Sequence, residues 1–168
     1  NRLAGEWGHN PLPWGVQGED PLIDCYCGQR GCNETLLSGP GLARDHGLHG
    51  GAALSAEAIA TAAATGDAAC AATLQRHAGR MARALASVIN LLDPDVIVLA
   101  GGVSRIGSLY VQVPQLWTRW VFSGGHRDRV RTRLVPSLHG AASGVRGAAW
   151  LGRDGGAMAI DNAQDSSH

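Results

Sequence analysis

The sequence contains no lysine, and all 14 of its basic residues are arginines. This absence excludes the lysine of the P-loop nucleotide-binding motif, a Schiff-base lysine and a lysine general base. A protein of this composition that handles ATP must therefore do so without a P-loop.

The sequence also lacks an excess of either charge and any long apolar run. Its 14 acidic residues balance the 14 arginines, and no basic stripe stands out, so we expect no nucleic-acid partner for this segment. No apolar run approaches the length of a membrane span, so we expect no membrane contact and a cytoplasmic location. Thiols stay reduced in the cytoplasm, which favours metal binding over disulfide formation.

The length and the apolar content are those of an ordinary globular domain. The chain has 168 residues, of which 45% are hydrophobic, enough for one domain with a real core. The chain enters its first motif almost directly after Asn1, so we expect it to be the carboxy-terminal part of a longer protein.

Residues 5–34 hold three thiols and one imidazole close together in sequence: His9, Cys25, Cys27 and Cys32. Zn²⁺ takes Cys₃His ligand sets in a closed tetrahedron, which is typical of a structural site. The alternatives are a disulfide or free thiols, but Cys25 and Cys27 lie too close for ordinary disulfide geometry and one thiol would be left over. We therefore predict one structural Zn²⁺ at these four residues. We interpret the remaining cysteine, Cys70, as a small buried apolar residue of a helix.

The spacing of apolar residues predicts two helices after this segment. Residues 1–41 are rich in Gly, Pro and Cys, so we predict loop and knuckle there, with local order supplied by the ion. Ser55 is placed to cap a helix through residue 64, and Asp67 to cap a longer one through residue 92. The longer helix carries one apolar face, which we interpret as core and nothing else: Cys70, Leu74, Ala78, Met81, Leu85, Ile89 and Leu92.

The second half of the chain has the pattern of an α/β protein. Residues 96–100 form an uninterrupted apolar run, typical of a strand covered on both faces. Further predictions are a helical stretch over 109–120 that Pro114 interrupts, a strand over 130–135, a helix over 143–151 capped by Ser143, and a disordered tail over 153–168. The glycine pair after residue 100 is by itself a weak sign of a nearby nucleotide.

Four segments resemble a known family. GEWGHNPLPW, CYCGQRGCNETLLSG, NLLDPDVIVLAGGVS and HGAASGVRGAAWL strongly resemble the ROK family of bacterial sugar kinases and sugar-responsive repressors, and within it the fructokinases. The resemblance covers roughly residues 3–151. It implies an actin/hexokinase-like (ribonuclease H-like) α/β fold of two lobes, with sugar and ATP in the cleft between them. Residues 1–152 would then be the carboxy-terminal lobe, with residues 9–34 as a zinc-knuckle insertion.

The resemblance also assigns roles to particular residues. Glu6, His9 and Glu34 match the residues that contact sugar hydroxyls in the family, with the histidine bound to zinc at the same time. Gly101 and Gly102 match the family's glycine turn beside the ATP, which binds with Mg²⁺. The arrangement makes chemical sense, because a metal-bound imidazole keeps its other N–H free to donate and a carboxylate accepts hydroxyl hydrogen bonds.

The match is incomplete in two respects. Fructokinases of the family usually read HGD before the last helix, whereas this chain has Ala141 at the aspartate position and so loses a carboxylate. The family's catalytic aspartate and its DxGGT-type phosphate loop belong to the amino-terminal portion, and neither motif occurs in these residues. We therefore expect no catalytic residue in this chain and no sugar phosphorylation by the chain alone.

Three functions are compatible with this sequence. The first is the carboxy-terminal part of an ATP-dependent hexose kinase, a fructokinase, which we expect to be a homo-oligomer when intact. The second is the sugar-sensing domain of a ROK repressor. The third is a zinc-stapled interaction module without a sugar site, which requires Glu6 and Glu34 to point away from each other.

Overall fold

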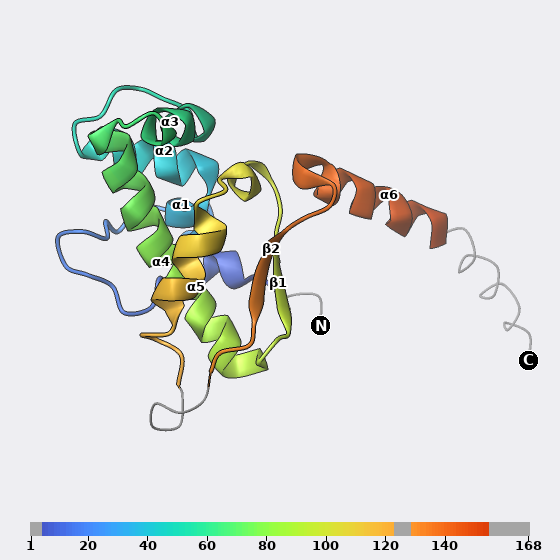
Figure 1. The fold of residues 1–168 in the computed structure, drawn as a ribbon. Coiled ribbons are helices and arrows are strands. Elements are labelled where there is room, and N and C mark those ends of the chain that lie inside the picture. Colours follow the sequence, from blue (N-terminus) through green and yellow to red (C-terminus); the bar gives the residue numbers. More distant parts are fainter. Residues whose placement is uncertain (1–4, 123–128, 155–168) are drawn as a thin grey trace, which may run out of the picture.

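The fold is organised around one long central helix, α4 (Ala68–Leu92) (Figure 1). The computed structural model describes residues 5–122 and 129–154. At the start of α4 the Asp67 side chain accepts a hydrogen bond of 2.8 Å from the backbone N–H of Cys70. At its end Asp93 adopts a left-handed backbone conformation that closes the last turn. Both ends of the predicted helix are confirmed.

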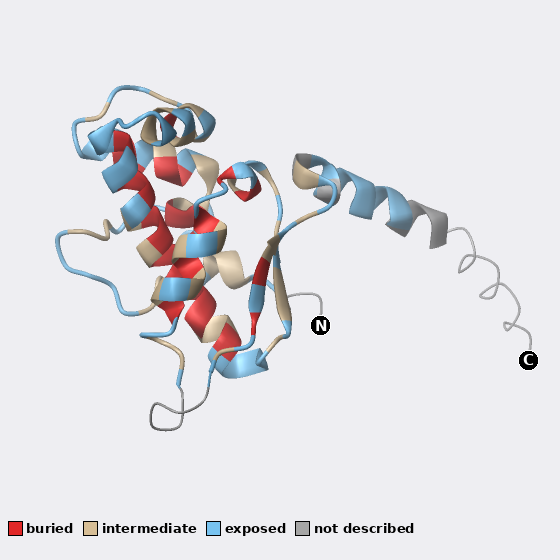
Figure 2. Ribbon diagram, in the orientation of Figure 1, coloured by how far each residue is buried: buried red, intermediate tan, exposed pale blue. Residues whose placement is uncertain are grey.

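One face of α4 forms the centre of the hydrophobic core, visible as the continuous buried band along the helix in Figure 2. Helices α3 (Ala56–Ala64) and α5 (Leu109–Trp117) pack against it. The predicted apolar face is buried from Cys70 to Ile89, but the prediction was wrong for Leu92, whose side chain is 73% exposed. Leu92 is the last residue of the helix, and the preceding Leu91 is exposed as well.

Two short helices were not predicted from the sequence: the first lies within residues 1–41, which were predicted as loop, and the second begins there and continues beyond them. They are α1 (Asn33–Leu37) and α2 (Gly39–Leu48), and both contact α4. Ser38 caps α2 by accepting a hydrogen bond of 3.2 Å from the N–H of Gly41, and Pro40 lies in the first turn. Proline is tolerated there because the first N–H groups of a helix have no partner within the helix. The Gly and Pro residues at 39–41 therefore form the first turn of a helix and not a loop.

The sheet consists of two parallel strands, β1 (Val96–Leu99) and β2 (Arg133–Pro136), with Val96 opposite Arg133. The 3₁₀ helix η2 (Gly102–Arg105) and α5 lie between them in sequence, so the unit is a β-α-β crossover. The expectation that the first strand is covered on both faces was wrong for the described residues. The Val98 side chain is 56% exposed, because the helices lie on one side of the sheet (Figure 1).

The remaining predictions have mixed outcomes. Pro114 lies inside α5 instead of interrupting it, and the buried Val113 and Trp117 hold the helix in place around it. After the short 3₁₀ helix η3 (Gly140–Ala142), the last helix, α6 (Ser143–Asp154), extends away from the body of the fold (Figure 1). Of the predicted tail over 153–168, the first two residues belong to α6 and the rest lie outside the described residues. No helix among the described residues is long and apolar enough to cross a membrane.

Candidate metal centre

The segment that carries the predicted metal ligands is a small knuckle of paired backbone. Pro11 pairs with Cys32, and Asp24 pairs with Arg30, both as antiparallel bridges. Gly31 has a φ of +72°, and a side chain there would come within 2.8 Å of the Leu22 side chain. Glycine at this position thus meets both a backbone and a space requirement. The pairing brings the two ends of the segment together.

The four predicted ligands meet in this knuckle and are called the ligand cluster below. The ligand atoms of His9, Cys25, Cys27 and Cys32 all lie within 4.8 Å of one another. Sγ of Cys27 lies 3.6 Å from Sγ of Cys32, and Sγ of Cys25 lies 3.5 Å from Nδ1 of His9. Neighbouring ligand atoms around a tetrahedral zinc are separated by about 3.8 Å when the Zn–S bond is about 2.3 Å. All four cysteines of the chain are free thiols, so the number, type and proximity of these groups fit a zinc ion.

The thiols of the ligand cluster differ in acidity. A backbone hydrogen bond from Gln29, together with the neighbouring thiols and His9, lowers the pKa of Cys27 to about 7. Burial, followed by the neighbouring thiols, raises the pKa of Cys32 to about 12. Because zinc binds thiolates and displaces their protons, Cys27 is better prepared to receive an ion than Cys32.

The His9 ring presents one nitrogen to the thiols and the other to a group of oxygen atoms. His9 lies at the end of the 3₁₀ helix η1 (Trp7–His9), next to α1, and its side chain is 21% exposed. Its Nε2 lies 3.5 Å from Oε2 of Glu34, 3.9 Å from Oε2 of Glu6 and 2.9 Å from the hydroxyl of Tyr26. A metal ion on Nδ1 would fix the proton on Nε2, so that the ring donates toward these oxygens.

The structure therefore brings Glu6, His9 and Glu34 together, whereas an interaction module without a sugar site required the two glutamates to diverge. A groove of about 440 Å³ adjoins Glu6 and is lined by Gly5, Glu6, Trp7, Asn10, Val88, Leu91 and Leu92. Sequence reasoning did not identify Tyr26, although its position between two ligand cysteines placed it near the cluster. The direction of its side chain depends on the folded knuckle.

Gly101 and Gly102 are not in this group. They lie at the carboxyl end of β1, where Gly101 has a φ of +77° and η2 begins. The Ser104 hydroxyl donates a hydrogen bond of 2.6 Å to the Gly101 carbonyl, which closes the turn. The first of the two positions thus needs glycine for its backbone conformation, while a side chain at Gly102 would meet only Glu57, at 3.8 Å.

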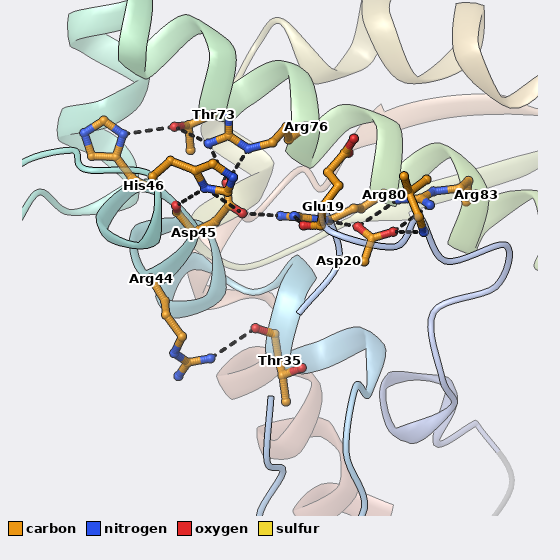
Figure 3. A network of polar contacts seen from close by, with 12 residues as sticks. Glu19, Asp20, Thr35, Arg44, Asp45, His46, Thr73, Arg76, Arg80 and Arg83 are labelled. Carbon is orange, nitrogen blue, oxygen red and sulfur yellow. Dashed lines mark hydrogen bonds and ion pairs between the residues drawn. The ribbon is translucent and has the colours of Figure 1, made fainter. Parts of the chain in front are cut away.

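A buried ion-pair network joins the loop between His9 and Cys25 to helices α2 and α4 (Figure 3). Arg80 is fully buried and donates to Asp20, at 2.8 Å, and to Asp45, at 2.7 Å. Arg83 contacts Asp20 at 2.7 Å, and Arg76 contacts Asp45 at 2.8 Å. Every charge in this group, called the ion-pair network below, faces an opposite charge.

Pairing within the ion-pair network outweighs the effect of burial on the pKa values of its members. Burial alone would raise the pKa of Asp20, but hydrogen bonds from Arg83, the Val16 N–H and Arg80 lower it below its usual value. Burial alone would lower the pKa of Arg80, but the carboxylates of Asp20 and Asp45 raise it. Both ions therefore stay charged in the interior, as buried charges do when they are paired.

The ion-pair network adds to one expectation and corrects another. The predicted apolar stripe is core as far as Ile89, but the helix also buries two arginines that the prediction did not include, Arg80 and Arg83, which are 0% and 3% exposed. Local order in residues 14–20 does not depend on the ion alone, because Arg83 also donates to the Trp14 carbonyl at 2.7 Å. The signal in the sequence was a pair of arginines three residues apart among apolar helix positions.

Comparisons with known proteins agree on one family. The sequence profile described as the ROK family matches residues 1–154. N-acetyl-D-glucosamine kinase of Photobacterium profundum is 36% identical over 155 residues, which is 90% of this chain and 50% of the relative.

Two solved structures are similar to this fold. A ROK family glucokinase from Streptomyces griseus, in complex with glucose and AMPPNP, superposes with a TM-score of 0.73 at 28% identity, over 90% of this chain and 52% of that chain. A ROK family transcriptional regulator, a homologue of the E. coli MLC protein, gives a TM-score of 0.61 at 28% identity, over 79% of this chain and 34% of that chain. The chain thus spans about half the length of the kinases that it matches.

Proposed function

The chain belongs to the ROK family, and on that premise we propose that it forms the zinc- and sugar-binding half of an ATP-dependent hexose kinase. The observation that carries the proposal is the orientation of His9. Its Nδ1 lies 3.5 Å from the Cys25 thiol, while its Nε2 faces Glu34 at 3.5 Å and Glu6 at 3.9 Å. One ring thus links the ligand cluster to a pair of carboxylates suited to bind hydroxyl groups.

The ligand cluster would hold the zinc ion, and His9, Cys25, Cys27 and Cys32 would be its four ligands. Bound zinc would order the knuckle and set the tautomer of His9. The Nε2–H of His9 then donates to one hydroxyl of the sugar. Glu6 and Glu34 accept from its hydroxyl groups, so that the sugar is oriented by residues of this chain. No ligand position remains for the sugar itself, because four protein ligands close the tetrahedron.

We propose fructose as the preferred sugar. The support is the resemblance of GEWGHNPLPW and SGVRGAAWL to the fructokinases. The kinases named above act on N-acetylglucosamine and glucose, which makes these two sugars the direct competitors in any assay.

The glycine turn at Gly101 and Gly102 is our candidate for the nucleotide side of the site. It lies where the backbone at the carboxyl end of a parallel strand can approach a bound nucleotide closely. The base that orients the attacking hydroxyl and the groups that neutralise the γ-phosphate with Mg²⁺ would come from the other half of the kinase. On this proposal the chain alone phosphorylates no sugar.

The test uses the full-length protein that carries this segment. We expect phosphorylation of fructose with ATP and Mg²⁺, and a Glu34→Gln variant whose KM for the sugar rises about 5- to 150-fold, the scale of a badly paired polar group. The KM for ATP should change little. The matched control is Asp24→Asn, because Asp24 lies in the same knuckle but pairs only with the exposed Arg30. An unchanged sugar KM in Glu34→Gln would remove Glu34 from the site.

A second function, the sugar-sensing domain of a transcriptional regulator, is supported by the likeness to the ROK regulator. The two functions share the sugar site and differ in catalysis. ADP formation that depends on added sugar identifies the kinase. Sugar binding of the same affinity without ADP formation, together with sugar-dependent release of DNA, identifies the regulator.

A further inference from the structure

The hydroxyl of Tyr26 lies at the meeting point of the groups to which we assign sugar binding. Tyr26 stands between two ligand cysteines, and its hydroxyl oxygen is 2.9 Å from Nε2 of His9. The same nitrogen faces the carboxylates of Glu34 and Glu6. A side chain of the knuckle therefore already occupies the position at which a sugar hydroxyl would contact His9.

The chemistry of this hydroxyl matches that of a sugar alcohol. When the proton of His9 is on Nε2, the tyrosine oxygen accepts a hydrogen bond from the His9 ring. The tyrosine O–H is then free to donate a hydrogen bond to a second group, which must be an acceptor. The carboxylates of Glu34 and Glu6, which face the same ring nitrogen, supply acceptors in this part of the knuckle. One acceptor and one donor function at this point are what a single sugar hydroxyl would supply.

Little else holds the Tyr26 ring in place. The side chain is 83% exposed, and its ring meets the edge of the His9 ring at a centroid distance of 5.0 Å and an interplanar angle of 88°. The backbone around Tyr26 is held in a turn, in which the N–H of Cys25 donates to the Gln29 carbonyl at 2.8 Å and the N–H of Gly28 donates to the Cys25 carbonyl at 3.0 Å. Departure of the hydroxyl is therefore a side-chain rotation, which requires no loop movement.

We propose that the Tyr26 hydroxyl holds the place of a sugar hydroxyl in the unliganded protein and is displaced when the sugar binds. The inference rests on the proposed sugar site. It adds a basis for selectivity, because a ligand must offer more than the one hydroxyl that it replaces. A sugar with adjacent hydroxyls meets this condition by reaching Glu6 and Glu34 together, whereas a simple alcohol does not.

The first test removes the hydroxyl and keeps the ring. In the zinc-loaded chain, Tyr26→Phe should bind D-fructose about two- to tenfold more tightly, since one competing hydrogen bond is lost. The matched control is Tyr110→Phe. The hydroxyl of Tyr110 donates to the Ser104 carbonyl at 2.6 Å, in a different part of the chain, and its loss should leave fructose affinity unchanged.

The second test observes the displacement directly. The chain has only two tyrosines, so isotope labelling of tyrosine rings gives one reporter in the site and one control ring, and labelling of histidine rings in the same sample reports on His9. On titration with D-fructose, the nuclear magnetic resonance signals of Tyr26 should move to those of a free ring together with the signals of His9. The signals of Tyr110 should stay constant. Propanol at the same concentration should leave Tyr26 in place.

The outcomes separate the two proposals. Weaker fructose binding by Tyr26→Phe would make Tyr26 a direct sugar contact and overturn the displacement. Movement of the His9 signals without movement of Tyr26 would also overturn it, while the sugar site would stand. If fructose, glucose and N-acetylglucosamine all fail to move the His9 signals, the sugar site itself is wrong and the displacement falls with it.

Discussion

The ligand cluster and the ion-pair network hold neighbouring parts of one loop in opposite ways. In the ligand cluster, three thiols and an imidazole converge without any group of opposite charge among them. In the ion-pair network, two aspartates and three arginines pair with one another, so that every charge has an opposite charge beside it. The first arrangement needs an added cation to be satisfied, whereas the second is complete in the chain itself.

This difference indicates two levels of order within residues 9–34. Asp20 lies between His9 and Cys25, so the ion-pair network fixes the middle of the segment whatever the state of the ligand cluster. The ends of the segment, which carry the candidate ligands, would be ordered by a bound ion. We infer that the network reduces the number of conformations that zinc has to organise.

Removal of zinc should have the largest effect and would separate the two levels. Zinc binding in small knuckles supplies about 10–16 kcal/mol, so chelation or Cys27→Ser should unfold residues 25–31 locally. The N–H of Val16, which donates to Asp20 at 2.6 Å, should keep its protection from hydrogen exchange, and the far-ultraviolet signal of α4 should persist. Equal loss of protection at Val16 and in residues 25–31 would mean that the two regions form a single unit.

Breaking the ion-pair network should have the next largest effect. Arg80→Met leaves the carboxylates of Asp20 and Asp45 buried without their shared partner, and this should lower the free energy of unfolding by about 3–5 kcal/mol. The control is Arg30→Met in the exposed pair with Asp24, which should cost about 0–1 kcal/mol. Denaturant unfolding of both variants measures the contrast, and equal costs would refute the special role of the interior pair.

Lowering the pH should reduce the free energy of unfolding through His77, a buried histidine whose pKa is affected by Arg80 and Asp45 of the ion-pair network. Burial, followed by the positive charge of Arg80, lowers the pKa of His77 to about 4, and Asp45 opposes this shift. The unfolded chain gains the proton at about pH 6.5, so the free energy of unfolding should fall by about 3 kcal/mol as the pH falls from 6.5 to 4. His77→Leu should flatten this part of the pH profile. An unchanged slope in that variant would assign the acid sensitivity to other groups, such as the zinc ligands.

The smallest expected effect concerns the helix that supplies Asp45. Ser38→Ala removes the hydrogen bond that Ser38 accepts from Gly41 at the start of α2, at a cost of about 1 kcal/mol. If the ion-pair network holds α2 independently, the Asp45 contacts should survive, and thermal unfolding should show a lower midpoint with one transition. A separate early transition would mean that the cap, and not the network, keeps α2 docked.

Features set by neighbouring residues were predictable from the sequence. The ends of α4 followed from Asp67 and Asp93, and the four candidate ligands were recognised because their side chains lie close together along the chain. The start of helix α2 was missed because the Gly and Pro content of residues 1–41 was interpreted only as loop.

Features that depend on distant pairs could not be predicted in this way. Arg80 and Asp20 are 60 residues apart, and their pairing exists only once the loop lies on α4. The same applies to Tyr26, whose hydroxyl reaches His9 across 17 residues of the knuckle. The exposure of Val98 depends on which elements cover β1, which the apolar run itself does not specify.

The loop that Asp20 anchors also contains a tryptophan whose stacking can be followed by spectroscopy. Trp14 has a φ of +50° and stacks on Trp120 with ring centroids 5.3 Å apart and an interplanar angle of 29°. Two indole rings held this close couple electronically, so their stacking should produce a paired signal in the near-ultraviolet circular dichroism spectrum. That signal depends on the loop lying against the end of α5, and it makes the docking of a ligand-bearing segment visible without any label.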